Sequence, residues 1–314
     1  MAIAEPAVET YLNRPIAKYV AATRPPFLLA ALVPCLIGLA TAWYDGIAPL
    51  ALTAVLTSIG ALLVHAGVNV LNDYYDALNG TDAANKERIY PFTGGSRFIQ
   101  NGVLSERETA VFGSALFVAS TLIGVVLLPY AGWGLVGVGL VGLLLGWAYS
   151  APPLALNSHG LGEISVALGF GFLIPLGADM VQRGAFDTLP LLAAAPYALL
   201  VAGLLYINQF PDWVADAAAG KHHWVVRLRP RRARWGYLGM VLVAYGALLL
   251  MVWSEVLPAT ALLGLLGAPL SLRAAMGVLR HAERPAMLAP AIQLTIAAML
   301  VHGVGLSVGL VLAA

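Results

Sequence analysis

The stretch APLALTAVLTSIGALLVHAGVNVLNDYYD, residues 48–76, decides the fold class of this 314-residue chain. It begins with an almost unbroken apolar run, and an α-helix needs about 20 such residues to span a bilayer. The run ends at Asn72-Asp73, so the helix brings polar side chains to one membrane surface. We therefore predict a spanning helix over 48–71 with a functional polar end.

The same kind of apolar window recurs along the chain. Hydrophobic residues make up 60% and charged residues 11%, and the mean hydropathy is +0.83, more apolar surface than a soluble fold of this size could bury. Long continuous runs argue against a β-barrel, whose strands alternate. We predict an all-α, polytopic membrane protein with nine transmembrane helices at residues 26–45, 48–71, 109–128, 131–150, 162–182, 189–211, 234–253, 256–273 and 287–313.

The basic residues indicate the orientation of these helices. With a cytoplasmic N-terminus, Arg183 is the only one of the 17 lysines and arginines that falls on the far side. This distribution follows the positive-inside rule and predicts a C-terminus on the far side of the cell (inner, cytoplasmic) membrane. The net charge of +1 gives no indication of a nucleic-acid partner.

The chain divides into two parts. Residues 1–24 lack the apolar core of a signal peptide, and we expect an interfacial segment with Tyr11, Ile16 and Tyr19 toward lipid. Residues 25–314 form a single transmembrane domain. Two long polar loops, 72–108 and 212–233, follow the second and sixth helices, so both open on the cytoplasmic side.

Each long loop begins with acidic residues spaced as neighbours on one helix face. In the first, the polar positions are three or four residues apart: Asn69, Asn72, Asp73 and Asp76, with Asp82 after Gly80. In the second they are four apart if the helix continues through Pro211: Asn208, Asp212 and Asp216, followed by Gly220 and Lys221.

These carboxylates favour a divalent cation. The macrodipole at a helix C-terminus disfavours negative charge, and carboxylates on facing helices repel unless cations bridge them. Mg²⁺ prefers oxygen ligands, uses few carboxylates and completes its shell with phosphate oxygens. Asp73, Asp76, Asp212 and Asp216 are therefore predicted metal ligands. Basic side chains should complete a diphosphate site, foremost Lys221 and Arg97, with further candidates Lys86, Arg88 and Arg227.

The histidines carry weaker signals. We interpret His65 and His159 as packing or interfacial residues. His222 and His223 would suggest zinc, but no cysteine or helix-spaced partner accompanies them.

At the two acidic clusters the sequence resembles the UbiA superfamily of intramembrane prenyltransferases. NVLNDYYDALNGTD and INQFPDWVADAAAGKHHWVVRL resemble its two Asp-rich motifs. TRPPFLLAALVPCLIGLATA, PFTGGSRFIQNG, YSAPPLAL and GLGEISVALGFGFLIPLGADMVQRG resemble the branch that prenylates 1,4-dihydroxy-2-naphthoate in menaquinone synthesis. Departures include Pro211 before Asp212, where relatives often carry Arg, and the His222-His223 pair after Gly-Lys.

The resemblance implies a bundle of the UbiA type and a Mg²⁺-dependent transfer from a polyprenyl diphosphate to an aromatic acceptor. It implies catalytic roles for the four aspartates and Lys221. It also implies substrate contacts for Asn69, Asn72, Asp82, Arg97, Tyr149, Tyr206 and Asn208.

Other functions remain open at this level. The acceptor could instead be hydroxybenzoate, homogentisate, a chlorophyllide, haem or a glycerol phosphate lipid. A secondary transporter also uses intramembrane acids, and a noncatalytic lipid-binding protein would bind without turnover. Besides membrane lipids and the two substrates, no obligate protein partner is evident.

Overall fold

The computed structural model describes residues 4–314, and this range contains helices but no strand. The α-helices are α1 (Val8–Tyr11), α2 (Pro15–Ala22), α3 (Pro25–Tyr44), α4 (Ala51–Leu78), α5 (Thr81–Ala84), α6 (Glu106–Ala131), α7 (Gly134–Ala148), α8 (Gly162–Leu168), α9 (Ile174–Arg183), α10 (Leu189–Ala218), α11 (Trp224–Trp253), α12 (Ala268–His281) and α13 (Ala289–Ala313). A π-helical turn, η1 (Gly169–Leu173), joins α8 to α9, and two 3₁₀ segments are η2 (Ala259–Gly267) and η3 (Pro285–Met287).

The helices confirm a multi-pass membrane protein. Eight segments of the described chain are long and apolar enough to span a bilayer: α3, α4, α6, the continuous unit α8–η1–α9, α10, α11, the unit η2–α12, and α13. The ninth predicted span, 131–150, is the shorter helix α7, with 15 residues. The predicted count therefore agrees with the structure apart from the length of this one helix.

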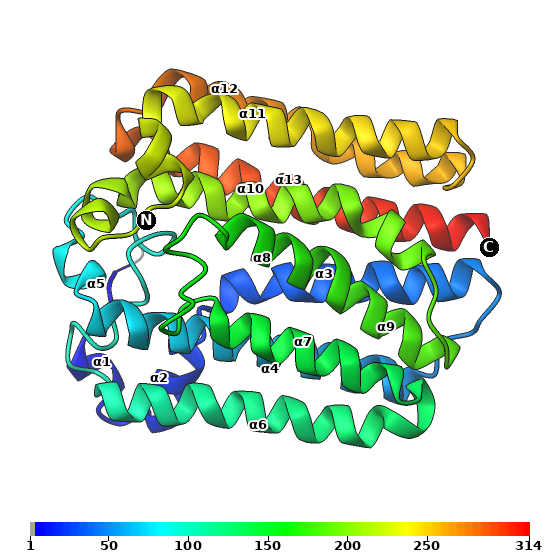
Figure 1. The fold of residues 1–314 in the computed structure, drawn as a ribbon, viewed down its shortest axis with the longest axis horizontal. Coiled ribbons are helices and arrows are strands. Elements are labelled where there is room, and N and C mark those ends of the chain that lie inside the picture. The colour runs from blue at the N-terminus through cyan, green and yellow to red at the C-terminus, as the bar shows by residue number, and fades with distance from the viewer. Residues whose placement is uncertain (1–3) are drawn as a thin grey trace.

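The spanning helices lie side by side along the long axis of the molecule (Figure 1). Helices α1 and α5 lie at one end of this bundle, and the C-terminus lies at the other. Helix α10 is its centre, because 72% of its apolar window is buried, against 11% for α6. Val118, Leu122 and Val125 of α6 are exposed, as expected for a surface that contacts lipid.

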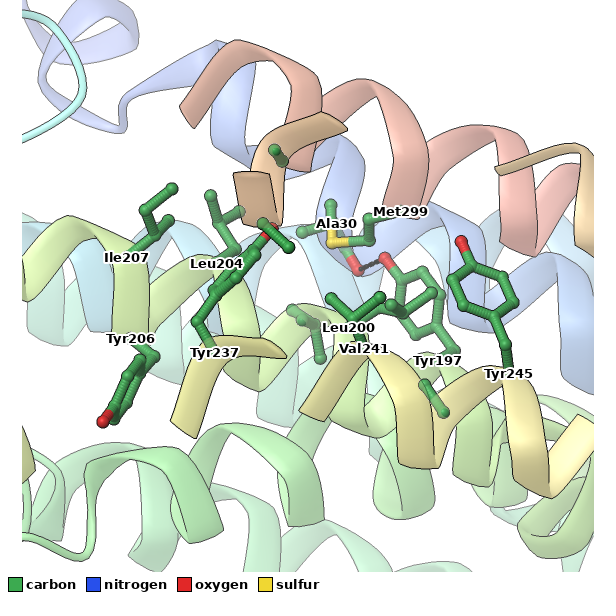
Figure 2. Close-up of a cluster of buried hydrophobic side chains, with 14 of the residues drawn as sticks. Ala30, Tyr197, Leu200, Leu204, Tyr206, Ile207, Tyr237, Val241, Tyr245 and Met299 are labelled. Atoms are coloured by element: carbon green, nitrogen blue, oxygen red, sulfur yellow. Dashed lines mark hydrogen bonds between the residues drawn. The ribbon is translucent and has the colours of Figure 1, made fainter. Parts of the chain in front are cut away.

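Tyrosines on α10 and α11 connect the helices of the core through hydrogen bonds of their hydroxyl groups. Figure 2 shows Tyr197 of α10 donating to the carbonyl of Ala30, at 2.9 Å. The Tyr237 hydroxyl of α11 lies 2.6 Å from Thr295 Oγ1 of α13. Such pairing is required in a bilayer interior, where no solvent can satisfy a polar group.

Small residues let some helices approach closely. A Cβ on Gly171 would overlap Ala198 of α10, and a Cβ on Gly38 would overlap the backbone of Pro175. Close contacts of this kind are typical of helix packing in membranes, where apolar burial alone gives little drive for association.

Arg183, the one basic residue predicted on the far side, is neutralised by carboxylates. Its guanidinium lies 2.7 Å from both Asp179 and Asp45, and 3.6 Å from Asp187. These contacts explain how a charge at the end of a spanning helix is tolerated.

The second loop is shorter than the sequence indicated. Residues 212–218 continue α10 through Pro211, and α11 begins at Trp224, so only residues 219–223 connect them. The helix α11 bends at Arg229, whose φ is 63°, just before Pro230.

In the N-terminal segment, the two tyrosines that were expected to face lipid pack on protein instead. The ring centroids of Tyr11 and Phe98 are 5.4 Å apart, and those of Tyr19 and Phe112 are 4.9 Å apart. Ile16 is exposed. The tyrosines face the protein because the 85–105 connection and the start of α6 supply an aromatic surface, which helix periodicity alone cannot reveal.

Candidate functional site

The first acidic cluster occupies the last turns of α4, which runs to Leu78 and so keeps its polar positions helical. The Asn72 amide donates to Asp76 Oδ2 and to Ser150 Oγ, each at 3.1 Å. The Asn69 amide donates to the Thr23 carbonyl at 3.0 Å. Asn69, Asn72 and Asp76 line one cavity.

The second cluster lies at the end of α10. Asp212 accepts from the Asn85 amide at 2.6 Å and from the backbone N–H of Gly94 at 3.2 Å. His223 Nε2 lies 3.0 Å from Asp216 Oδ2. Because the Val226 N–H donates to His223 Nδ1, the imidazole proton is on Nε2 and points to Asp216.

Lys221 connects the two clusters. Its Nζ lies 2.9 Å from Asp76 Oδ1 on α4 and 3.2 Å from Asp216 Oδ1 on α10. Burial disfavours the ammonium form, but the two carboxylates outweigh this effect and raise the pKa of Lys221 above its usual range. Two acid clusters 140 residues apart in sequence, as counted from Asp76 to Asp216, thus share one cation.

Asp73 faces a different cation. Its carboxylate accepts from the Arg24 guanidinium and from the Ser96 N–H at 3.2 Å. Burial opposes the charge of Arg24, yet Asp73, Asp82 and Asp76 raise the pKa of this guanidinium. Asp73 does not line the cavity, whereas Arg24 does.

Asp82 is buried near the first cluster, with 2% of its surface exposed. Burial, followed by the negative charges of Asp76 and Asp73, raises the pKa of its carboxyl to about 8. Asp82 therefore holds a proton near neutral pH unless a further cation arrives.

Arg97 is not where the sequence suggested. Its guanidinium donates to the backbone carbonyl of Asp82 and lies 3.9 Å from Glu5 Oε2, outside the cavity lining. Arg88 also pairs with Glu5, at 2.6 Å. These two arginines fix the N-terminal segment to the 85–105 connection, and Arg24 takes the place beside the cavity that was expected for Arg97.

A cavity of about 510 Å³ extends from these clusters into the bundle. On α4 its lining runs from Asp76 to Thr57, which at 1.5 Å per residue is about 28 Å. Beyond His65 the walls are mostly apolar, with glycines on α6 and α7 such as Gly124, Gly139 and Gly142. The cavity thus has one charged end and one long apolar part.

Five of the seven predicted substrate contacts line this cavity, and Arg97 and Tyr206 do not. The five are Asn69, Asn72, Asp82, Tyr149 and Asn208. Tyr149 follows the last residue of α7 and lies half-buried in the lining. Asn208 also lines the cavity, with a buried Oδ1 that has no partner in residues 4–314. Tyr206 packs in the core, and its hydroxyl donates to the Ala233 carbonyl at 2.9 Å.

The misplacement of Tyr206 has a geometric reason. It precedes Asn208 by two residues, and positions two apart on a helix point in nearly opposite directions. Tyr206 therefore lines a separate groove against α11.

The donor set suits a hard cation. Asp76, Asp212 and Asp216 present oxygen ligands to the cavity, joined by the amides of Asn72 and Asn208. Within residues 4–314 no three His, Cys, Asp or Glu side chains stand close enough to bind one ion. Mg²⁺ does not need three, because it commonly takes one or two carboxylates, water and phosphate oxygens. Lys221 contacts two of these carboxylates, those of Asp76 and Asp216, so a bound cation would compete with its ammonium group for them.

Sequence reasoning missed Arg24, Asn85 and His223. Arg24 could have been found, because it directly precedes the first span at Pro25-Pro26 on the predicted cytoplasmic side. Asn85 and His223 carry no such signal, since their roles depend on which helix end they face.

Comparison with known proteins identifies the family to which this fold belongs. Residues 31–304 match the UbiA prenyltransferase family. The chain belongs to this family and is a prenyltransferase, which decides against the transporter. It is 30% identical to 1,4-dihydroxy-2-naphthoate octaprenyltransferase of Mycobacterium tuberculosis, over 91% of this chain and 94% of that protein. It is also 30% identical to the Escherichia coli protein of the same name, over 84% and 85%.

A solved structure shares the fold. The UbiA homolog from Archaeoglobus fulgidus, in its structure bound to DMAPP and Mg²⁺, superposes with a TM-score of 0.64. The match covers 93% of this chain and 99% of that one at 18% identity.

Proposed function

We propose that this enzyme transfers the prenyl group of a polyprenyl diphosphate to 1,4-dihydroxy-2-naphthoate, with Mg²⁺, as a step in menaquinone biosynthesis at the cell (inner) membrane. The relatives from M. tuberculosis and E. coli are named for this acceptor. The observation that carries the proposal is the single cavity, which joins the Lys221-bridged carboxylates to about 28 Å of mostly apolar wall. A polyprenyl diphosphate is divided in the same way, into a charged head group and a long apolar tail.

The charged end would bind the diphosphate. Mg²⁺, held by Asp76, Asp212 and Asp216, with Asp73 behind them, would neutralise the leaving diphosphate. Lys221 and Arg24 lie beside the same carboxylates and can donate to phosphate oxygens once released from them. The amides of Asn69, Asn72 and Asn208 would orient the head group.

The apolar part would hold the tail and exclude water. The bond from the allylic carbon to the diphosphate oxygen breaks with its electron pair going to diphosphate, and a carbon of the electron-rich acceptor ring bonds to that allylic carbon. The ring regains its aromaticity by losing the acceptor carboxylate as CO₂. Tyr149, in the cavity wall near the charged end, is an aromatic residue that would stabilise the positive charge that develops. Excluding water protects this carbon from hydrolysis.

The test is transfer by purified protein with Mg²⁺, a labelled polyprenyl diphosphate and dihydroxynaphthoate. Asp76→Ala and Asp212→Ala should each lower the rate by roughly 100-fold or more, because each removes a group that binds the charged reactant. Glu283→Gln, an exposed carboxylate between α12 and η3, is the control and should retain the wild-type rate. Transfer in EDTA-treated, metal-free buffer, or full activity of Asp76→Ala, would contradict the proposal.

A further inference from the structure

His65 is a buried imidazole in the wall of the cavity with no hydrogen-bond partner in residues 4–314. It lies on α4 on the same face as Asn69, Asn72 and Asp76, spaced by four, three and four residues. Only 9% of its surface is exposed. The sequence suggested a packing residue, and its ring does stack edge-on against Phe170, with centroids 4.8 Å apart.

The two ring nitrogens of His65 differ in their surroundings. Nδ1 is enclosed by protein and has no hydrogen-bond partner within residues 4–314. Nε2 likewise has none there, but it does not belong to the enclosed atoms, so a molecule in the cavity can reach it. Buried polar atoms in proteins are nearly always paired. An imidazole left unpaired in a substrate cavity therefore points to a ligand group that completes it.

The place of His65 along α4 limits which substrate supplies that group. It lies 11 residues before Asp76, about 16 Å along the helix axis, and four before Asn69, about 6 Å. The diphosphate would bind at the Asp76 end. The donor tail is hydrocarbon and offers no hydrogen bond. The partner of Nε2 therefore comes from the acceptor.

The aromatic acceptor carries two hydroxyls and one carboxylate. The 1-hydroxyl is adjacent to the carboxylate and donates to it internally, so the 4-hydroxyl is the group that remains free to pair with the protein. Phe170 holds the His65 ring from η1, the only π-helical turn in residues 4–314, and such turns are frequent at functional sites.

We propose that the Nε2–H of His65 donates a hydrogen bond to the 4-hydroxyl oxygen of the bound dihydroxynaphthoate, and so orients the ring toward the allylic carbon. The proton lies on Nε2 because Nδ1 is enclosed and has no acceptor for an N–H within residues 4–314. The inference rests on the proposed function for the identity of the acceptor. It adds a substrate-contacting residue outside both Asp-rich motifs.

The test compares His65→Phe, His65→Gln and His65→Asn. Glutamine can place a polar atom where Nε2 stood, while asparagine reaches only the Nδ1 position. Phe and Asn should raise the KM for dihydroxynaphthoate by roughly tenfold, the effect of one lost hydrogen bond, and Gln should restore a value near wild type. The affinity for the prenyl diphosphate with Mg²⁺ should stay unchanged in all three.

A matched control is His302→Asn. His302 is also buried and stacked edge-on against a tyrosine, Tyr245, but its Nδ1 bonds to the Gly264 carbonyl and it lies outside the cavity. Asparagine can keep that bond, so His302→Asn should leave the KM for the acceptor unchanged.

Equilibrium binding measurements test the same inference without turnover. Wild type should bind dihydroxynaphthoate more tightly than His65→Phe, while 1-hydroxy-2-naphthoate, which lacks the 4-hydroxyl, should bind both equally. Equal diol binding by wild type and His65→Phe, or equal loss in all three His65 variants, would overturn the inference. Should the wild type make no prenylated product while diol binding still depends on His65, the proposed reaction would fail and this site would stand.

Discussion

The ammonium of Lys221 lies 2.9 Å from Asp76 Oδ1 and 3.2 Å from Asp216 Oδ1, so one side chain joins the two acidic helix ends. Both carboxylates are buried, with 9% and 6% of each residue exposed. Without this cation two negative charges would face each other at low dielectric. Lys221 thus neutralises two of the carboxylates that would hold a divalent cation.

Lys221→Gln should therefore destabilise the metal-free protein and respond strongly to Mg²⁺. Removing one member of a buried ion pair costs about 3–5 kcal/mol, because the remaining charge is left unpaired. We expect Mg²⁺ to raise the melting temperature of the variant more than that of wild type in thermal unfolding in detergent. Equal Mg²⁺ shifts in both proteins would show that the metal binds elsewhere.

Replacing Arg24 should show whether Asp73 needs its partner. Arg24→Gln leaves the buried Asp73 carboxylate with the Ser96 N–H but no cation. We expect kcat/KM for the polyprenyl diphosphate to fall by roughly 10–100-fold, as for other residues that hold a metal-site carboxylate. Arg107→Gln, an exposed arginine at the start of α6, is the control for lost positive charge. A similar loss in both variants would point to a general surface effect.

The raised pKa of Asp82 predicts that the free energy of unfolding depends on pH. Its pKa is about 8 in the folded protein, against an ordinary aspartate value of 3.8 in the unfolded chain, so between these values the folded state holds a proton that the unfolded state has lost. The free energy of unfolding of the metal-free protein should therefore fall as pH rises from about 4 to about 8. In Asp82→Asn this slope should be shallower, as measured by chemical denaturation at several pH values. An unchanged slope would place the titrating group elsewhere.

The glycines of α7 should set the length of the donor. Gly139 lines the cavity and Gly137 does not, yet a Cβ on either would meet nothing within 4 Å. Gly139→Leu should raise the KM for a long polyprenyl diphosphate by roughly tenfold, because the side chain enters the space for the tail, and should spare a short donor. Gly137→Leu should change neither. Competition between long and short labelled donors gives the ratio directly.

Much of the fold followed from the apolar windows, because a spanning helix can be recognised from its length and composition. The spacing of Asn69, Asn72 and Asp76 placed these side chains on one face, and α4 keeps them there. Tyr206 was predicted at the site from its position along the helix, but its side chain points away from the cavity. Arg97 was predicted to contact the diphosphate because it is close to the first acidic cluster in sequence. Closeness in sequence does not determine the direction of a loop, and the Arg97 side chain lies outside the cavity lining.

The sequence by itself determined a helical membrane protein with two acidic helix ends, since hydropathy and helical periodicity are properties of short segments. Only the tertiary structure decided which charges meet: Lys221 with Asp76 and Asp216, and Arg24 with Asp73. It also decided that His65 opens to the cavity and Tyr206 does not. The physical reason is that partners of buried polar groups come from helices distant in sequence, and their packing fixes them.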